Sequence, residues 1–259
     1  VSMALIHDGA PVWVGAYGYA DLEAQRPMTP DTICRAESIS KSATARGVMT
    51  LVEQGLISLD TPVEQYLTDW NLSTSDQTVT VEQLLSNTSG LPLGLIGPPT
   101  EYAPGQPKPS ARAFLADQVE LVREPGAGFL YSDVGFNLLE LLVEEVTGDD
   151  FAAYMESEVL APLGMHDSSF LWREAYGPAI AAGYEMDGTP VEPYVYPASA
   201  SGGLLTDVED LARFVAGGMN GSEAVLSPQS LQAIYEPRVE IPGLFGFVAD
   251  AYGFGHFIE

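Results

Sequence analysis

Lysine is scarce in this sequence, whereas acidic residues are abundant. Lys41 and Lys108 are the two lysines, and 36 acidic residues stand against ten basic ones, so the formal net charge is −26. A surface this acidic repels phosphate backbones, which argues against nucleic-acid binding. The excess also indicates adaptation to high salt. We expect the fold to be less stable at low ionic strength, where charge repulsion is weakly screened.

Cysteine, histidine and long apolar runs are also in short supply. The single cysteine, Cys34, excludes an internal disulfide, and we interpret it as a small buried apolar residue. The histidines His7, His166 and His256 are far apart and belong to no HExxH or CxxC motif, so we predict no metal site and no cofactor. No run of about 18 apolar residues is present, and no membrane span is predicted.

Strand patterns lie at both ends of the chain, and helical patterns lie between them. The Asp8-Gly9 pair predicts an N-terminal hairpin, and AYGFGHFIE predicts a C-terminal strand. Helices are predicted over 38–54, 111–121, 134–147 and 151–160, in TDVEDLARFVAGG, and after Ser227-Pro228. We therefore predict a single α/β (α+β) domain over 1–259, with an α/β layer formed by 1–60 and 168–259 and a mainly helical insertion at 61–167.

The segment SISKSATA places Lys41 among hydroxyl groups at the head of a predicted helix. Residues three or four apart share a helix face, so Lys41 can reach Ser38 or Thr44, whereas Ser40 and Ser42 point elsewhere. Ser38 lies at the helix start, where free backbone N–H groups favour a developing oxyanion. A lysine in its uncharged form can act as the base that activates a serine nucleophile. The alternative for S-x-x-K alone is a capping serine followed by a solvated lysine.

A second candidate lies far downstream, in EPGAGFLYSDVGFNLLELLVEEVTG. Here Tyr131 and Asp133 lie immediately before the strongly apolar helix predicted over 134–147. A tyrosine hydroxyl beside a lysine can pass protons between a nucleophile and a leaving group. The alternative for Tyr131 is a half-buried ring that packs the loop.

Together these segments resemble the serine β-lactamase and penicillin-binding protein superfamily, nearest to class C β-lactamases, their D-peptidase relatives and family VIII carboxylesterases. The resemblance runs along the chain through RAESISKSATA, GLISLDTPVEQYL, VEQLLSNTSGLP, PGAGFLYSDVGFNLL, VLAPLGMHDSSF, SGGLLTDVEDLARF and YGFGH. It implies an antiparallel sheet flanked by helices with an inserted, mainly helical region. It also implies acyl transfer, in which Ser38 attacks a carbonyl while Lys41 and Tyr131 move the proton. Which of the two is the base is left open, and the Ser38 backbone N–H is expected to be one oxyanion donor.

One departure from the family pattern is Asp133, which stands where relatives have asparagine. An ionised aspartate only accepts hydrogen bonds, whereas an asparagine also donates to a substrate amide. A carboxylate beside Lys41 also favours the charged ammonium form. We therefore expect Asp133 to bind substrate, with small esters turned over better than β-lactam or D-peptide amides.

The other departure is the third family motif, a K-T-G or H-x-G strand, which this sequence lacks. We expect C-terminal sheet strands and terminal helices to be missing, and a second polypeptide is a candidate partner that supplies the strand. His256, in YGFGH, is a weak candidate to replace the missing motif. The resemblance thus predicts a serine hydrolase acting on a small molecule. The alternative is a non-catalytic binding or regulatory protein with an incomplete site.

The sequence opens on a strand pattern, VSMALIH, with neither an initiator methionine nor a signal peptide, so we expect earlier residues to have been removed or left out. The compartment stays unassigned, because a β-lactamase or D-peptidase would be periplasmic or secreted and an esterase cytoplasmic.

Overall fold

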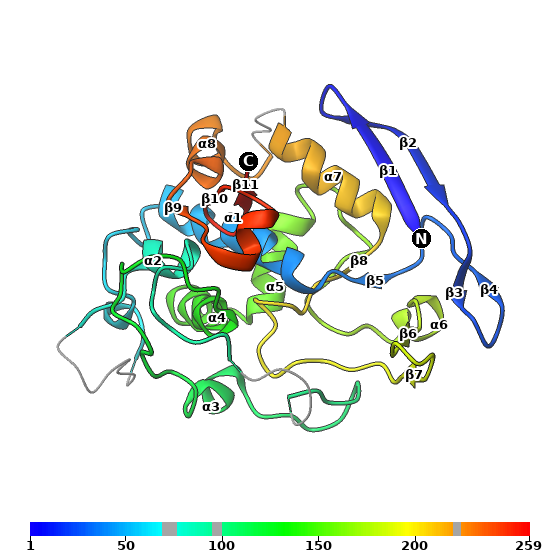
Figure 1. Cartoon of the computed structure of the whole chain (residues 1–259), viewed down its shortest axis with the longest axis horizontal. Helices are drawn as coiled ribbons and strands as arrows, with labels where there is room; N and C mark the ends of the chain where they lie inside the picture. Colours follow the sequence, from blue (N-terminus) through cyan, green and yellow to red (C-terminus); the bar gives the residue numbers. More distant parts are fainter. Residues whose placement is uncertain (69–76, 95–99, 220–223) are drawn as a thin grey trace.

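A computed structural model describes residues 1–68, 77–94, 100–219 and 224–259. Helices α1 and α4 lie side by side near the centre, and the shorter elements surround them (Figure 1). The α-helices are α1 Ser40–Glu53, α2 Val81–Leu85, α3 Ala111–Leu115, α4 Asp133–Thr147, α5 Phe151–Met155, α6 Tyr176–Ala179, α7 Val208–Met219 and α8 Pro228–Tyr235. Three 3₁₀ turns cover Glu37–Ile39, Val63–Gln65 and Gly243–Phe247, and a π turn covers Glu156–Leu160.

The described strands are short and pair in antiparallel ladders. They are β1 Ser2–His7, β2 Ala10–Ala16, β3 Tyr19–Asp21, β4 Arg26–Pro27, β5 Cys34–Arg35, β6 Gly183–Tyr184, β7 Pro190–Val191, β8 Leu205–Thr206, β9 Val239–Glu240, β10 Ala251–Tyr252 and β11 Phe257–Ile258. Ladders join β1 to β2, β3 to β4, β5 to β8 and β6 to β7, while β10 lies between β9 and β11. This mixture of helices and antiparallel strands confirms the predicted α/β class.

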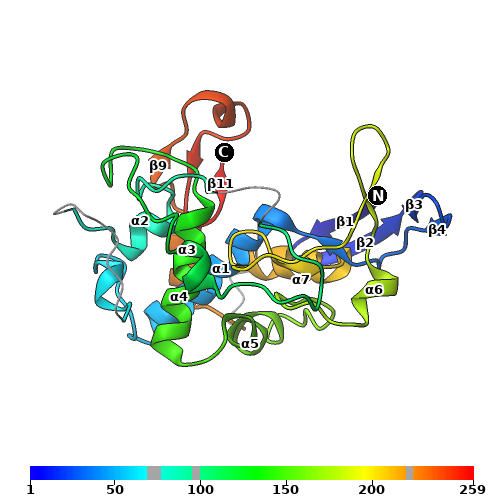
Figure 2. The same cartoon turned by 90° about the horizontal axis from the view of Figure 1, so that it is seen from below.

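The N-terminal hairpin forms as predicted. Asp8 and Gly9 both have positive φ, of 49° and 68°, which is the geometry that a two-residue turn between twisted strands requires. The hairpin lies alongside α7 in both views (Figures 1 and 2). Helix α7 is therefore covered by the hairpin on one side.

The pairing of β5 with β8 brings together segments that are about 170 positions apart. Cys34 pairs with Thr206 and Arg35 with Leu205. The backbone N–H of Ala36 also donates to Leu204 O at 2.9 Å. As a result, the turn before α1 lies against the loop that precedes β8.

Helix α4 forms the centre of the apolar core because most of its positions are apolar. Val134, Phe136, Leu138, Leu139 and Leu142 are all buried within one cluster. The helix begins where the Ser132 hydroxyl accepts from the Gly135 N–H, and it ends at Gly148, which has φ of 76°. This matches the expected helix and its glycine stop.

Helix α3 is shorter than the predicted 111–121. It ends at Leu115, and the backbone N–H groups of Val122 and Arg123 both donate to Gly90 O. These hydrogen bonds hold the following segment against a distant loop, so tertiary contacts override the local helical pattern.

The predicted C-terminal strand is in fact two short strands, β10 and β11, joined by a turn. Gly255 in this turn has φ of 71°, and an added Cβ would lie 2.6 Å from Lys41 O. Its carbonyl accepts from the Ser42 hydroxyl, and its N–H donates to Leu85 O. The turn is thus fixed against the first turns of α1 by a residue that has to be glycine.

None of the helices in the described ranges is both long and apolar enough to cross a membrane. The division into an α/β layer and a helical insertion stays a prediction.

Candidate active site

Ser38 and Lys41 meet at the head of α1, as their spacing predicted. Ser38 lies in the 3₁₀ turn directly before the helix, and its side chain is exposed to solvent. Lys41 lies in the first turn of α1 and is only 1% exposed, with its Nζ donating to Ser38 Oγ at 3.2 Å. An accessible hydroxyl therefore contacts a buried amine.

The neighbouring hydroxyls bond elsewhere. Ser40 Oγ accepts from the Leu204 N–H, Ser42 Oγ donates to Gly255 O, and Thr44 Oγ1 donates to Ala200 O. All three bonds hold α1 against other segments. Ser38 is therefore the hydroxyl of this segment that is bonded to Lys41.

Lys41 Nζ has two further partners that come from distant parts of the chain. It donates to Asp133 Oδ1 at 2.5 Å and to the backbone carbonyl of Ser201 at 2.9 Å. With Ser38 these make three acceptors, which equals the number of donors on an ammonium group. The buried cation is therefore paired with a carboxylate and fully hydrogen-bonded, as burial of a charge requires.

Asp133 is the first residue of α4, and the loop before it is fixed by side chains. Asn87, at a positive φ of 55°, accepts from the Ser132 N–H through Oδ1. The Ser132 hydroxyl donates to Pro92 O and caps the helix. Asn87 therefore supports the loop that presents Asp133.

Tyr131 approaches Lys41 with the face of its ring. Lys41 Nζ lies 4.7 Å from the ring centroid, which is the geometry of a cation–π contact. The ring also stacks on Phe245 and Phe257, with centroids 5.4 Å and 6.3 Å away. Among the described residues the Tyr131 hydroxyl makes no hydrogen bond to Ser38 or Lys41, so its role in proton transfer stays a prediction.

The Ser38–Lys41–Asp133 group opens into a cavity of about 180 Å³. Its lining includes Glu37, Ser38, Asp133, Asn137, Tyr196 and Ser201. Glu37, at a positive φ of 46°, accepts from Arg35 Nε at 3.0 Å and from the Tyr196 hydroxyl at 3.1 Å. The residue before Ser38 thus lies in a conformation that is uncommon outside glycine, and hydrogen bonds from neighbouring side chains hold it there.

The remaining sequence candidates lie outside this cavity. His256 is partly buried, its Nδ1 lies 2.8 Å from Phe254 O, and loss of solvent around the ring lowers its pKa to about 4. It lines a separate, mostly apolar cavity together with Ser42 and Tyr235. Burial raises the pKa of the Cys34 thiol, which is consistent with an unreactive packing residue.

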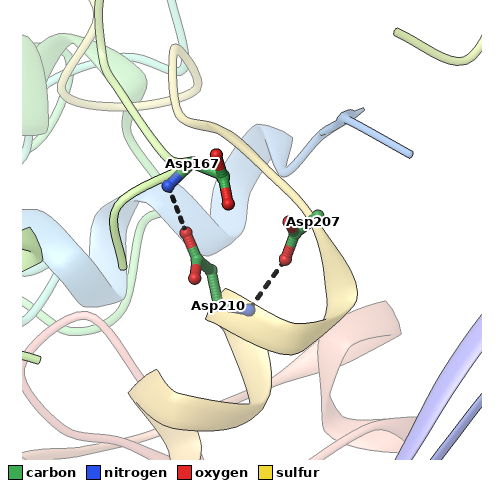
Figure 3. A group of neighbouring side chains, drawn as sticks. All are labelled: Asp167, Asp207 and Asp210. Carbon is green, nitrogen blue, oxygen red and sulfur yellow. Dashed lines mark hydrogen bonds between the residues drawn. The ribbon is translucent and has the colours of Figure 1, made fainter. Parts of the chain in front are cut away.

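A group of three carboxylates lies at the start of α7 (Figure 3). The ligand atoms of Asp167, Asp207 and Asp210 lie within 4.8 Å of one another. Asp207 Oδ1 accepts from the Asp210 N–H at 2.8 Å, while Asp210 accepts from the Asp167 N–H, the Ser168 hydroxyl and Arg213. Asp207 and Asp210 begin the helix, and Asp210 ties it to the distant segment 167–168, so protein donors already occupy much of the hydrogen-bonding capacity of Asp210.

Sequence reasoning missed several residues of the site. Ser201 contributes a backbone carbonyl, which leaves no side-chain pattern to find. Asn137 could have been found, because it is a polar residue in an apolar helix, four positions after Asp133. Glu37 and Tyr196 carry no motif of their own.

Known proteins resemble this chain along its whole length. The family model described as Beta-lactamase matches residues 1–259. The chain is 27% identical to Protein flp of Staphylococcus aureus (strain COL) over 221 residues, and 34% identical to Esterase EstB of Burkholderia gladioli over 172 residues. These matches cover 83% and 61% of this chain, and 44% of each relative.

The fold is also similar to a solved structure, the octameric penicillin-binding protein homologue from Pyrococcus abyssi. The TM-score is 0.83 at 31% sequence identity, and the match covers 98% of this chain and 59% of the other. The chain therefore spans less than half the length of the two curated relatives and about three fifths of this structural one.

Proposed function

Because this chain belongs to the beta-lactamase family, we propose that it is a serine hydrolase in which Ser38 forms an acyl-enzyme. One observation carries the proposal. The exposed Ser38 hydroxyl lies 3.2 Å from the nitrogen of a buried lysine, at the edge of a cavity.

The reaction proceeds in two steps. Ser38 Oγ attacks the carbonyl carbon of the substrate, the proton of Ser38 passes to a base, and the leaving group departs with a proton. Water then attacks the acyl-enzyme and regenerates Ser38. Lys41 Nζ, in its uncharged form, is the nearest nitrogen that can accept the proton, and Asp133 and the Ser201 carbonyl hold that nitrogen in place. Tyr131 is the other candidate base.

Small esters are the favoured substrates over β-lactam or D-peptide amides. The Asp133 carboxylate lines the cavity and accepts hydrogen bonds, so it gives no N–H to a substrate carbonyl. The Asp133 carboxylate also accepts from Lys41 Nζ at 2.5 Å, so it competes with Ser38 for the nitrogen that would serve as the base. Esters have better leaving groups than amides and tolerate a weaker base. The similarity to Esterase EstB supports this choice.

The alternative is a binding or regulatory protein with the same fold and no turnover. A fluorophosphonate probe separates the two functions, because it reacts with an activated serine. We expect it to label the wild-type protein and not Ser38→Ala. Hydrolysis of p-nitrophenyl butyrate is expected to exceed that of nitrocefin. Equal labelling of both proteins, or a folded wild type that stays unlabelled, would contradict the hydrolase proposal.

A further inference from the structure

Glu140 is a buried carboxylate on α4 that the proposed reaction does not use. It is 5% exposed, and its Oε2 accepts from the backbone N–H groups of Ser199 and Ala200 at 2.6 Å and 2.8 Å. The Ser199 hydroxyl also lies within bonding distance of the same oxygen, at 3.3 Å. Each of these donors belongs to the loop that precedes β8. Glu140 therefore ties this loop to α4.

The tied loop is a tight turn over 199–203. The N–H groups of Gly202 and Gly203 both point to Ser199 O, at 3.2 Å and 2.6 Å. A Cβ on Gly203 would lie 2.5 Å from the Ser199 side chain, so the turn leaves no room for a larger residue. Inside this turn the carbonyl of Ser201 accepts from Lys41 Nζ. The position of the Lys41 amine thus depends on how the turn is held.

Three residues on one face of α4 contact the turn or Lys41 directly. Asp133, Asn137 and Glu140 are spaced by four and three positions, so they follow one another along the helix. Asp133 bonds Lys41, Asn137 Oδ1 accepts from the Ser201 N–H at 3.2 Å, and Glu140 holds the start of the turn. Helix α4 therefore fixes two of the three acceptors of the lysine, Asp133 directly and the Ser201 carbonyl through the turn.

We propose that Glu140 is a positioning residue, whose ionised carboxylate holds the 199–203 turn so that the Ser201 carbonyl is directed at Lys41. Its effect on turnover rests on the hydrolase function proposed above. A carboxylate accepts hydrogen bonds more strongly than a neutral acid. Loss of the charge on Glu140 therefore loosens the turn and the lysine together.

The charge on Glu140 changes near neutral pH. Burial raises its pKa to about 7, against the opposing effect of the two N–H donors. The carboxyl is therefore mostly neutral below pH 7 and mostly ionised above it. The ionisable side chains that share its cavity are Arg35, Lys108, Glu144, Asp150, Tyr194 and Tyr196. Among them, Glu144 raises the pKa of Glu140 and Lys108 lowers it.

The first test compares two glutamates on the same helix. Glu140→Gln removes the charge and keeps the shape, so we expect kcat for p-nitrophenyl butyrate at pH 8 to fall about 10-fold with little change in KM. The rise of kcat around pH 7 should also disappear. Glu144→Gln is the matched control. Glu144 lines the same cavity but accepts from the Phe151 N–H and not from the turn, so kcat of Glu144→Gln at pH 8 should stay at the wild-type level, while the rise of kcat moves to a somewhat lower pH because Glu144 raises the pKa of Glu140.

The second test does not depend on turnover. With two lysines in the chain, 13C-lysine labelling gives two side-chain signals, and Lys108→Arg identifies the one from Lys41. We expect the Lys41 signal of the wild type to shift with a midpoint near pH 7, and that transition to vanish in Glu140→Gln and persist in Glu144→Gln.

The outcomes separate the two proposals. A wild type without Ser38-dependent turnover, but with the pH transition of Lys41, overturns the hydrolase function and leaves the positioning role supported. A Lys41 signal with the same pH response in wild type and Glu140→Gln overturns the positioning role, as does an unchanged pH profile of kcat. The wild-type titration needs no variant to fold, and a signal that stays constant between pH 6 and pH 8 also overturns the role.

Discussion

Helices α4 and α7 both begin with acidic residues, but the two groups use their carboxylates differently. At the start of α4, Asp133 accepts from the buried ammonium of Lys41, in the wall of the cavity that holds Ser38. At the start of α7, Asp207 and Asp210 accept mainly from backbone N–H groups, Ser168 and Arg213 (Figure 3). The carboxylates at the start of α7 thus cap a helix. The carboxylate of Asp133 differs because its partner, Lys41, also contacts the exposed hydroxyl of Ser38.

The largest expected effect tests that contrast directly. Lys41→Met should lower kcat/KM for p-nitrophenyl butyrate about 1,000-fold, because Ser38 loses the amine that contacts it. Asp207→Asn keeps an oxygen for the α7 cap and should leave kcat/KM within about twofold of the wild type. Steady-state kinetics on both variants measure this. Comparable losses in the two variants would erase the distinction between the groups.

For the free energy of unfolding, we expect a large effect in the α7 group, whose substitution should leave kcat/KM nearly unchanged. Asp210→Ala removes a buried carboxylate that accepts from a backbone N–H, a hydroxyl and Arg213, so we expect a loss of about 2–3 kcal/mol in the free energy of unfolding. Urea unfolding gives the value, and the labelling of Ser38 by a fluorophosphonate in the folded variant should be unchanged. A fully stable Asp210→Ala protein would mean that the α7 group does not hold the helix.

A moderate effect is expected at Asp133. Asp133→Asn offers a donor to a substrate amide and removes the negatively charged carboxylate that lies beside Lys41. We therefore expect nitrocefin turnover to rise about 5- to 10-fold. The gain for p-nitrophenyl butyrate should be smaller. If the folded variant loses nitrocefin turnover, the carboxylate is required for chemistry and our interpretation of the substitution is wrong.

The pH dependence of stability provides a finer comparison. Burial, together with the nearby charges of Asp210 and Asp167, raises the pKa of Asp207 to about 6, against the lowering effect of the Asp210 N–H. The native state therefore binds this proton more tightly than the unfolded chain. The stability from protonated Asp207 is present below about pH 4 and is lost as the pH rises through 6. Thermal melts between pH 4 and pH 7 should show a smaller loss in Asp207→Asn than in the wild type, because buried Glu140, whose pKa is raised to about 7, titrates over the same range in both proteins.

The smallest expected effect is on the melting temperature, and it comes from the surface carboxylates that lie outside the starts of α4 and α7. With a net charge of −26, the surface repels itself, and salt screens that repulsion. We expect the melting temperature to rise by a few degrees between dilute buffer and molar NaCl, about equally in the wild type and in Asp133→Asn. A flat response to salt would argue against adaptation to high salt.

The sequence predicted the parts of the site that depend on local spacing. Ser38 and Lys41 are three positions apart where a 3₁₀ turn leads into α1, and this spacing allows their contact. Helix α4, its Gly148 stop and the Asp8-Gly9 turn follow from propensity and turn chemistry in the same way.

The rest depends on contacts between distant segments. The Ser201 carbonyl reaches Lys41 because a turn 160 positions away is held by α4, and no local pattern encodes that. Tyr131 stacks on Phe245 and Phe257 and presents its ring face to Lys41, an arrangement that depends on residues more than 110 positions downstream, and its role in proton transfer stays a prediction.

The turn at Gly255 has a practical consequence for engineering. Because any side chain there would collide with the backbone of Lys41, libraries that randomise the C-terminal segment should return glycine at this position almost without exception. An alignment built from the survivors would mark Gly255 as strictly required although it lies outside the substrate cavity, and a screen for activity alone would mistake it for a member of the site.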